Sequence, residues 1–292
     1  MVNAVIVATF IFLVAVSMTM VGKGGGNFYV VILALTGAPM HEAATTGQFI
    51  LFTASVAAIT VYHRNNTVVW PLAVTVGGLM AISAFFGGYF SHVVSGFVLK
   101  VLFAAMLLIA GGLMLVPIRN TAGRKPRSRF GSVTPIGPNK GNSIAQIFGN
   151  AWGTTEILLR ASTLGERDYH VNPWIVVPVV ALTGFASGMV GVSGGSFLMP
   201  LLVLLCGVPM HTAVGTASVV IAASAVMGFT GHALQGDFNP SWAIPLATVT
   251  VVGGLLGGCF ALQTKPKYLR QVFAYTNWLA ALALLVGALN AK

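Results

Sequence analysis

Charged residues are scarce in this sequence. Asp, Glu, Lys and Arg make up 7% of its 292 residues, and hydrophobic residues make up 56%, whereas a soluble domain carries about 25% charged residues. A folded domain with so few charges cannot cover its surface with groups that water solvates. The composition therefore predicts an integral membrane protein surrounded by the lipid bilayer.

Acidic residues are the rarest charged class, with five against fifteen Lys and Arg. Three of the five, Glu156, Glu166 and Asp168, lie in one segment. The HExxH and P-loop motifs are missing, and the GxSxG spacing at Gly191–Gly195 follows an apolar run in place of the strand that a nucleophile elbow needs. We therefore expect a protein that is not an enzyme and that needs no cofactor.

The net charge of +10 would suggest a nucleic-acid partner in a soluble protein. Here the basic residues lie mostly in loops between apolar segments, where they orient membrane proteins, so no nucleic acid is expected. Cysteine is also rare, and Cys206 and Cys259 lie apart in apolar surroundings. We interpret both as small core residues and predict neither a disulfide nor a metal site.

The apolar residues form runs of about 20, the length of a membrane-spanning helix. The 35 glycines and the lack of alternating apolar segments argue against a β-barrel, so we predict an all-α polytopic membrane protein. The segments of the first half are Val2–Val21, Phe28–Thr36, His41–Tyr62, Val68–Phe90 and Gly96–Val116, and those of the second half are Trp174–Val190, Phe197–Cys206, His211–His232, Trp242–Leu262 and Tyr268–Leu289. The first segment has no basic start and no clear cleavage site, so we interpret it as a mature helix and not as a signal peptide.

A different kind of sequence separates the halves. Residues 117–172 are rich in Arg, Gly, Ser, Pro and Asn and hold eight Lys and Arg against three acidic residues. The positive-inside rule places such a segment in the cytoplasm. The predicted organisation is a transmembrane unit over 1–116, a basic cytoplasmic linker over 117–172 and a second transmembrane unit over 173–292, in a multi-pass protein of a bacterial inner membrane.

The two transmembrane units share a motif. GKGGGNF (Gly22–Phe28) is followed by GAPMHEAATTGQ (Gly37–Gln48), and GVSGGSF (Gly191–Phe197) is followed by GVPMHTAVGTAS (Gly207–Ser218). From Gly37 to Val116 the halves stay aligned at a shift of 170 residues. A duplicated apolar unit with glycine breaks at matching places is typical of transporters whose site lies between the repeats.

The orientation of the two repeats depends on the second segment of each half. Both segments are too short to cross about 30 Å of hydrocarbon as straight helices. If they return to the side they came from, the repeats are parallel, and Lys265, Lys267 and Arg270 face outward. If they cross, the repeats are inverted, and these residues fall inside with the linker while both termini lie outside. The basic residues favour the inverted arrangement.

The glycine clusters predict discontinuous helices, because each glycine costs about 1 kcal/mol relative to Ala inside a helix. We expect new helices to begin at Phe28 and Phe197, with Asn27 and Ser196 as their N-caps. The free N–H groups would point at the breaks, and two breaks that face each other would form one anion site. Close helix packing through glycine is the alternative.

Lys23 lies inside the first break, where a charge is expensive. It either supplies the fixed positive charge for a small anion or snorkels to the cytoplasmic interface. Hydroxyl groups at the start of the following long segments either contact substrate oxygens or join helices. The predicted substrate-binding residues are Lys23, Gly24, Gly25, Gly26, Asn27, Thr45, Thr46, Ser193, Gly194, Gly195, Ser196, Thr212 and Thr216.

Glu42 is the single acid inside an apolar segment, and His41 precedes it. This pair is a candidate for proton coupling, and His211, which matches His41 in the second repeat, is a further candidate. A cap at the positive start of the helix is the alternative role for Glu42. Lys100 and Arg270 also match between the repeats, which favours a structural role such as a cap.

Four stretches resemble the sulfite exporter family TauE/SafE: GFASGMVGVSGGSFLMPLL, GVPMHTAVGTAS, GGLLGG and KPKYLRQVF. The resemblance covers most of both halves but not the linker. It is weaker in the first half, where Lys23 interrupts the glycine pattern and TTGQ replaces a Thr-Ser pair. The resemblance implies export or uptake of small sulfur-containing anions, such as sulfite or sulfonates, by secondary transport.

The predicted function is therefore secondary transport of a small sulfur-containing anion, of the sulfite or organosulfonate class, across the inner membrane by alternating access. A passive small-anion channel would use the same site. A non-transporting membrane scaffold would owe its glycines to packing. The sequence leaves open the direction of transport, the coupling ion and whether the chain forms a homo-oligomer.

Overall fold

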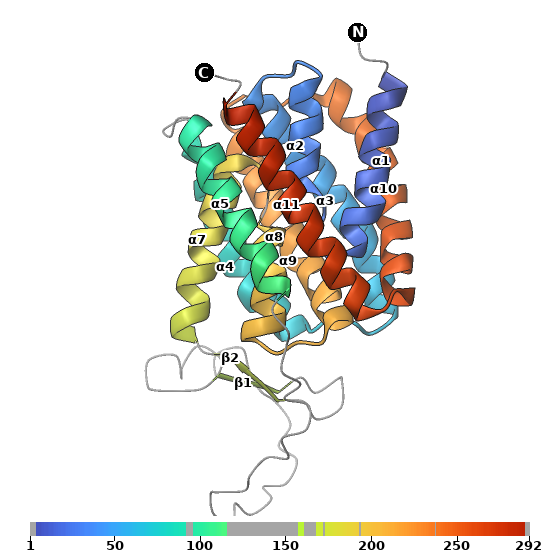
Figure 1. Cartoon of the computed structure of the whole chain (residues 1–292), viewed down its shortest axis with the longest axis vertical. Helices are drawn as coiled ribbons and strands as arrows, with labels where there is room; N and C mark the ends of the chain where they lie inside the picture. Colours follow the sequence, from blue (N-terminus) through green and yellow to red (C-terminus); the bar gives the residue numbers. More distant parts are fainter. Residues whose placement is uncertain are drawn as a thin grey trace, which may run out of the picture.

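The computed structural model describes residues 4–91, 96–115, 157–160, 168–171, 173–192, 194–236 and 238–289. They form a bundle of helices with a small two-stranded hairpin at one end (Figure 1). The start of α1 and the end of α11 both lie at the end of the bundle opposite this hairpin. Among the described residues, four helices are long and apolar enough to cross a membrane: His41–Arg64, Trp70–Tyr89, Met210–Ala233 and Pro240–Gln263.

Each predicted apolar segment is helical, and both of its ends lie within two residues of the predicted bounds. The first half contributes α1 (Ala4–Met20), α2 (Gly26–Leu35), α3 (Met40–Arg64), α4 (Trp70–Tyr89) and α5 (Gly96–Leu115). The second half contributes α7 (Pro173–Val190), α8 (Gly195–Pro200) with its continuation η3 (Leu201–Leu205), α9 (Met210–Ala233), α10 (Pro240–Gln263) and α11 (Pro266–Leu289).

Within the linker, the structure describes two short strands, which the sequence analysis did not expect. β1 (Ile157–Arg160) pairs with β2 (Asp168–Val171) in an antiparallel register that places Ile157 opposite Val171. The remainder of residues 117–172 lies outside the described part of the chain, apart from these strands.

Proline sets the start of the long central helices. Pro39 is the N-cap of α3, with φ −54° and ψ 145°, and Pro209 is the N-cap of α9, with φ −57° and ψ 146°. Proline cannot donate a backbone hydrogen bond, so it separates the preceding segment from the new helix. Each of these helices therefore begins directly after the Pro of its Pro-Met-His motif.

The helices of the two halves interlock. The fourth helix of the first half, α4, packs against α7 and α9 of the second half, and α10 packs against α1 and α3 of the first half. The central contact joins α3 to α9, and α5 packs against α11. Each half therefore has most of its packing surface on the other half.

Glycine allows these helices to approach closely. A Cβ atom added to Gly87 of α4 would collide with the carbonyl group of Phe185 in α7, and one added to Gly257 of α10 would collide with that of Val16 in α1. Small residues bring helix backbones together in membranes. At these two positions, which match between the halves, glycine serves close helix packing.

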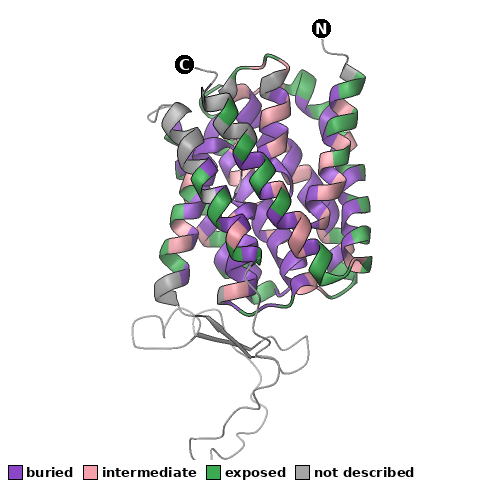
Figure 2. Ribbon diagram, viewed as in Figure 1, coloured by how far each residue is buried: buried purple, intermediate pink, exposed green. Residues whose placement is uncertain are grey.

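Buried residues fill the centre of the bundle, while exposed residues lie on its outer helices (Figure 2). Many exposed residues are apolar, as in Phe10 with 57% exposure and Leu182 with 69%. Cys206 is buried as predicted, but Cys259 is exposed on α10, so its assignment to the core was wrong. The outside of a membrane bundle is as apolar as its core, and hydrophobicity therefore does not separate the two.

Candidate functional site

Two glycine breaks interrupt the helices where the sequence predicts them. Between α1 and α2, φ is +77° at Gly22, +71° at Gly24 and +92° at Gly25. Between α7 and α8, φ is +82° at Gly191 and +58° at Gly194. Side chains strongly disfavour this left-handed region, so glycine is required for the chain to turn from one helix into the next.

The two breaks lie against each other. A Cβ atom on Gly26 would lie 2.9 Å from the carbonyl oxygen of Val192, and one on Gly195 would lie 2.7 Å from the carbonyl oxygen of Lys23. These residues occupy matching positions in GKGGGNF and GVSGGSF. The predicted meeting of the two breaks is therefore confirmed, and it brings together the N-termini of α2 and α8.

The predicted N-caps are wrong. Helix α2 begins at Gly26 and α8 begins at Gly195, two residues before the predicted starts, and the N-cap of α8 is Gly194. Asn27 and Ser196 therefore lie in the first turn of each helix. Their side chains meet instead, and Asn27 Nδ2 donates a hydrogen bond of 3.4 Å to Ser196 Oγ.

Aliphatic side chains close the space over the breaks. Leu51 of α3 contacts the positions of a Cβ on Gly24 and Gly26, and Ile221 of α9 contacts those on Gly24 and Gly195. Leu51 and Ile221 are both at most 1% exposed, and they match at the shift of 170 residues. The breaks are buried, and this pair of side chains covers them from the two central helices.

Lys23 is buried beside this crossing. It is 1% exposed, and its Nζ has no hydrogen-bond partner among the residues that the structure describes. The nearest aromatic rings are those of Phe273, with its centroid 5.3 Å from Nζ, and Phe28, with its centroid 5.9 Å away. The snorkelling alternative is therefore wrong. A buried ammonium group without an anionic partner is costly, and cation–π contacts compensate for only part of that cost.

Asn277 is a polar residue of this region that the sequence analysis missed. It lies one turn after Phe273 on α11, so both residues share one face of the helix. It is 0% exposed, and neither atom of its amide has a partner in the described part of the chain. Buried polar groups without partners need an explanation, such as a ligand. An amide inside an apolar run was the signal that could have identified it.

Gln48 of α3 is a second buried amide without a partner. It is 0% exposed, and neither atom of its amide makes a hydrogen bond with a described residue. Its amide contacts the position of a Cβ on Gly228 of α9. The hydroxyl groups of Tyr29 and Thr19 are likewise buried without a described partner. The interior of the bundle therefore holds several polar groups that no residue in the described part of the chain satisfies.

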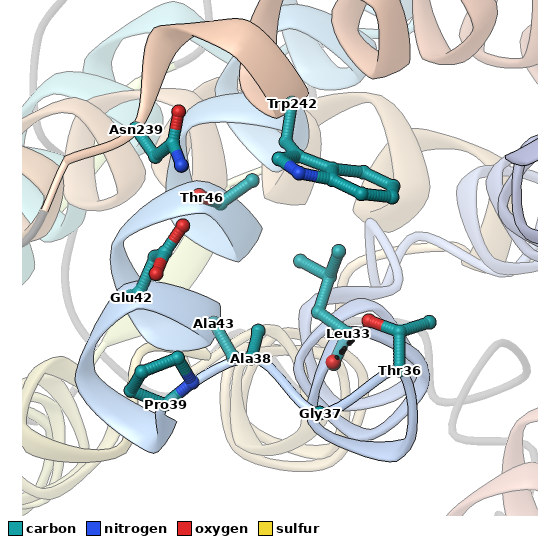
Figure 3. A pocket seen from close by; sticks show the side chains of 10 residues that line it. All are labelled: Leu33, Thr36, Gly37, Ala38, Pro39, Glu42, Ala43, Thr46, Asn239 and Trp242. Atoms are coloured by element: carbon teal, nitrogen blue, oxygen red, sulfur yellow. Dashed lines mark hydrogen bonds between the residues drawn. The ribbon is translucent and has the colours of Figure 1, made fainter. Parts of the chain in front are cut away.

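A cavity of about 300 Å³ opens at the end of the bundle opposite the hairpin (Figures 1 and 3). It lies between the end of α2 and the starts of α3 and α10, with exposed Gly37 and Pro39 at its rim. Its lining residues are Leu33, Thr36, Gly37, Ala38, Pro39, Glu42, Ala43, Thr46, Asn239 and Trp242. Thr46 is 2% exposed, and its hydroxyl has no partner among the described residues.

The corresponding corner at the hairpin end is closed. Thr216 matches Thr46, and its Oγ1 accepts a hydrogen bond of 3.0 Å from the backbone N–H of Val69. A Cβ on Gly215 would lie 2.6 Å from the carbonyl oxygen of Thr67. The two ends of the bundle therefore differ, with an open cavity over Thr46 and direct packing over Thr216.

The other predicted threonines do not join the breaks. Thr45 is buried and donates a hydrogen bond of 2.8 Å to the carbonyl oxygen of His41, and Thr212 is half-buried in the first turn of α9. Ser193 lies outside the described residues, as does the side chain of Lys100. The proposed roles of Thr45, Thr212 and Ser193 in substrate binding stay predictions, as does the structural role of Lys100.

The proton-coupling candidates lie at opposite ends of the bundle. Glu42 lines the cavity. His41, the residue before Glu42, is half-buried. A ring nitrogen of His211 lies 2.9 Å from the carbonyl oxygen of Thr264, which joins the start of α9 to the end of α10.

Arg270 donates hydrogen bonds of 3.2 and 2.8 Å to the carbonyl oxygen of Met114. This contact agrees with a structural role for Arg270, which here binds a carbonyl group in the last turn of α5.

Comparison with known proteins agrees with the resemblance seen in the sequence. The family model described as sulfite exporter TauE/SafE matches residues 7–284. The probable membrane transporter protein YdhB of Bacillus subtilis is 22% identical over 275 residues, which cover 94% of this chain and 97% of that protein.

Other relatives match over shorter stretches. The probable membrane transporter protein YunE of Bacillus subtilis is 30% identical over 99 residues, which cover 33% of this chain and 36% of that protein. The sulfite exporter TauE/SafE family protein 6 of Arabidopsis thaliana is 30% identical over 107 residues, which cover 36% of this chain and 25% of that protein. No solved structure matches the chain significantly.

Proposed function

Because this chain belongs to the TauE/SafE family of sulfite exporters, which are membrane transporters, we propose that it carries a small sulfur-containing anion, sulfite or an organosulfonate, across a bacterial inner membrane. The observation that supports this most is the buried ammonium group of Lys23 beside two helix N-termini that meet. Positive charge and free backbone N–H groups together suit an anion. The buried amide of Asn277 and the hydroxyl of Ser196 offer further donors.

We propose that the two halves are inverted repeats related by a pseudo-two-fold axis. Their contacts pair in the manner that such an axis requires, since α4 meets α7 and α9 as α10 meets α1 and α3. Matching glycines make matching contacts, at Gly87 and Gly257 and again at Gly26 and Gly195. Both ends of the described chain lie opposite the hairpin, as inversion requires. The basic linker would then lie in the cytoplasm.

We propose alternating access, and the difference between the two ends supports it. The cavity over Thr46 supports an assignment of this structure to a state open toward the end away from the linker. Leu51 and Ile221 close the centre, and the Thr216 corner closes the linker end. In the opposite state, the start of α3 around Thr46 would be packed closed, as the start of α9 around Thr216 is in this structure. Exchange of conformations between repeats is the usual basis of alternating access in such transporters.

The aliphatic cover over the breaks leads to a prediction. Leu51→Ala and Ile221→Ala are each expected to raise the affinity for sulfite severalfold, because less apolar volume must move before an anion reaches the backbone N–H groups. Both variants should also lose about 2–5 kcal/mol of stability, as buried Leu and Ile truncations do. Thermal-shift titration of purified protein with sulfite measures both effects.

The matched control is Leu72→Ala, which truncates a side chain that is 1% exposed on α4. Leu72 makes none of the contacts over the breaks, so this variant should lose stability without any gain in affinity. Equal sulfite responses in all three variants would show that Leu51 and Ile221 do not cover an anion site.

Transport itself is tested with the full chain in liposomes. Labelled sulfite is expected to accumulate against its own gradient when a pH gradient is imposed, and a protonophore should abolish this accumulation. We propose that Glu42, with His41, couples the proton to the anion, so Glu42→Gln should uncouple uptake from the pH gradient. Accumulation that is unchanged in Glu42→Gln would refute this role, and strictly downhill flux in the wild type would identify a passive channel.

A further inference from the structure

The cavity at the start of α3 and α10 carries a charge of the wrong sign for an anion. Glu42 is one of its walls, and no Lys or Arg is among the residues that line it. The carboxylate makes no hydrogen bond or ion pair with any residue that the structure describes. Glu42 lies in the first turn of α3, where the helix dipole favours a negative charge. A carboxylate in a partly enclosed space also attracts a cation and repels an anion.

A second observation also indicates a ligand. Thr46 forms part of the same lining, and its hydroxyl is buried without a partner in the described structure. Figure 3 shows Glu42, Thr46 and Asn239 together on one side of the cavity, with Trp242 and Leu33 on the other. The side-chain oxygen of Asn239 accepts a hydrogen bond of 3.2 Å from the backbone N–H of Ser241, which fixes the orientation of this amide.

The remaining walls favour an organic cation over a bare metal ion. The volume of about 300 Å³ is roughly ten times the volume of a water molecule in the liquid. Leu33, Ala38 and Pro39 offer apolar surface for methylene groups, and the indole ring of Trp242 is the aromatic group that attracts ammonium ions most strongly.

The duplicated corner shows that the repeat does not require these side chains. At the shift of 170 residues, Thr212 stands in the place of Glu42, Leu72 in the place of Trp242 and Val69 in the place of Asn239. That corner has no carboxylate at the matching position, and its Thr216 is engaged by a backbone N–H. The polar and aromatic groups of the open cavity therefore belong to one end of the protein alone.

We propose that this cavity is a second ligand site, distinct from the central breaks, which binds a small primary ammonium ion. The Glu42 carboxylate is its counter-ion, the Thr46 hydroxyl accepts one of its N–H bonds, and the face of Trp242 covers it. This site lies apart from the central breaks, but its carboxylate is the one proposed above to couple the proton, so a bound ammonium ion would compete with that proton for Glu42.

The proposal is tested by thermal-shift and calorimetric titration of the purified full chain with ethylammonium chloride. The anion control is sodium ethanesulfonate, which has the same carbon chain, and sodium chloride controls for ionic strength. Ethylammonium is expected to stabilise the wild type in a saturable manner, beyond the effect of sodium. Glu42→Gln should abolish this stabilisation, and Trp242→Leu should weaken ethylammonium binding about fivefold.

Two variants distinguish binding at this cavity from binding at the central breaks. Trp242→Leu should leave the response to ethanesulfonate unchanged, whereas Lys23→Met should lose that response and keep the response to ethylammonium. If Glu42→Gln does not fold, Thr46→Val and Trp242→Leu carry the test, and both must weaken ethylammonium binding. Absence of a saturable ethylammonium response in the wild type, an equal response to sodium, or an undiminished response in Glu42→Gln would overturn the proposal, whatever happens at the central site.

Discussion

Lys23→Met is expected to weaken anion binding strongly while making the protein more stable. The Nζ of Lys23 is buried without a described hydrogen-bond partner, and replacement of buried charges by apolar groups of similar volume stabilises some proteins by about 1–4 kcal/mol. An anion at the meeting of the breaks would lose its only nearby positive side chain among the described residues, at a cost of about 2–5 kcal/mol. Sulfite affinity should therefore fall by roughly 30- to 5,000-fold.

Both effects are measured in one thermal-shift titration with sulfite, followed by uptake in liposomes. Lys267→Met is the matched control, because Lys267 is exposed at the start of α11. This control should bind and transport sulfite as the wild type does. If Lys23→Met keeps its sulfite response, the central anion site does not exist as proposed. If Lys23→Met loses stability instead, Lys23 supports the fold in a way that its described contacts do not explain.

Gly195→Val is expected to prevent stable folding. A Cβ atom there would lie 2.7 Å from the carbonyl oxygen of Lys23 and 2.8 Å from Cδ1 of Ile221. Backbone cannot yield as a flexible side chain can, so the two breaks would have to separate. We expect a loss above about 4 kcal/mol, which is exceptional for one substitution and a large part of the 5–15 kcal/mol that typically stabilises a protein, taken here as an order of magnitude.

The yield of monodisperse protein and its thermal unfolding measure this effect. Gly78→Val provides the control, since no heavy atom lies within 4 Å of the position of a Cβ on Gly78. Gly78 lies within α4, and Val is a slightly better helix former than Gly, so this variant should keep or slightly gain stability. Equal stability of the two variants would mean that the breaks do not need their close approach.

The helices were predictable because membrane helices obey two local rules. An apolar run of sufficient length forms a helix in lipid, and Gly and Pro end it. This is why α3 and α9 each begin directly after the Pro of a Pro-Met-His motif. The starts of α2 and α8 were misplaced because glycine tolerates the first helical turn, so the helix extends back over Gly26 and Gly195.

The candidate site was predictable only in part. Lys23 and the glycine breaks are anomalies in an apolar sequence, and such anomalies are visible without a structure. Asn277 was missed because it has no matching polar residue in the first half, where Leu107 stands at the corresponding position. Cys259 was misplaced because an apolar residue suits lipid as well as it suits the core.

The sequence by itself determined the membrane class, the helical segments, the breaks and the presence of a lysine inside the first break, because each of these follows from composition and short-range pattern. The tertiary structure alone decided which groups meet. It placed Gly26 against Val192 and Gly195 against Lys23, covered both breaks with Leu51 and Ile221, and opened a cavity over Thr46 while closing the corner of Thr216. These outcomes depend on packing between helices far apart in the chain, and two nearly identical motifs can therefore end in different surroundings.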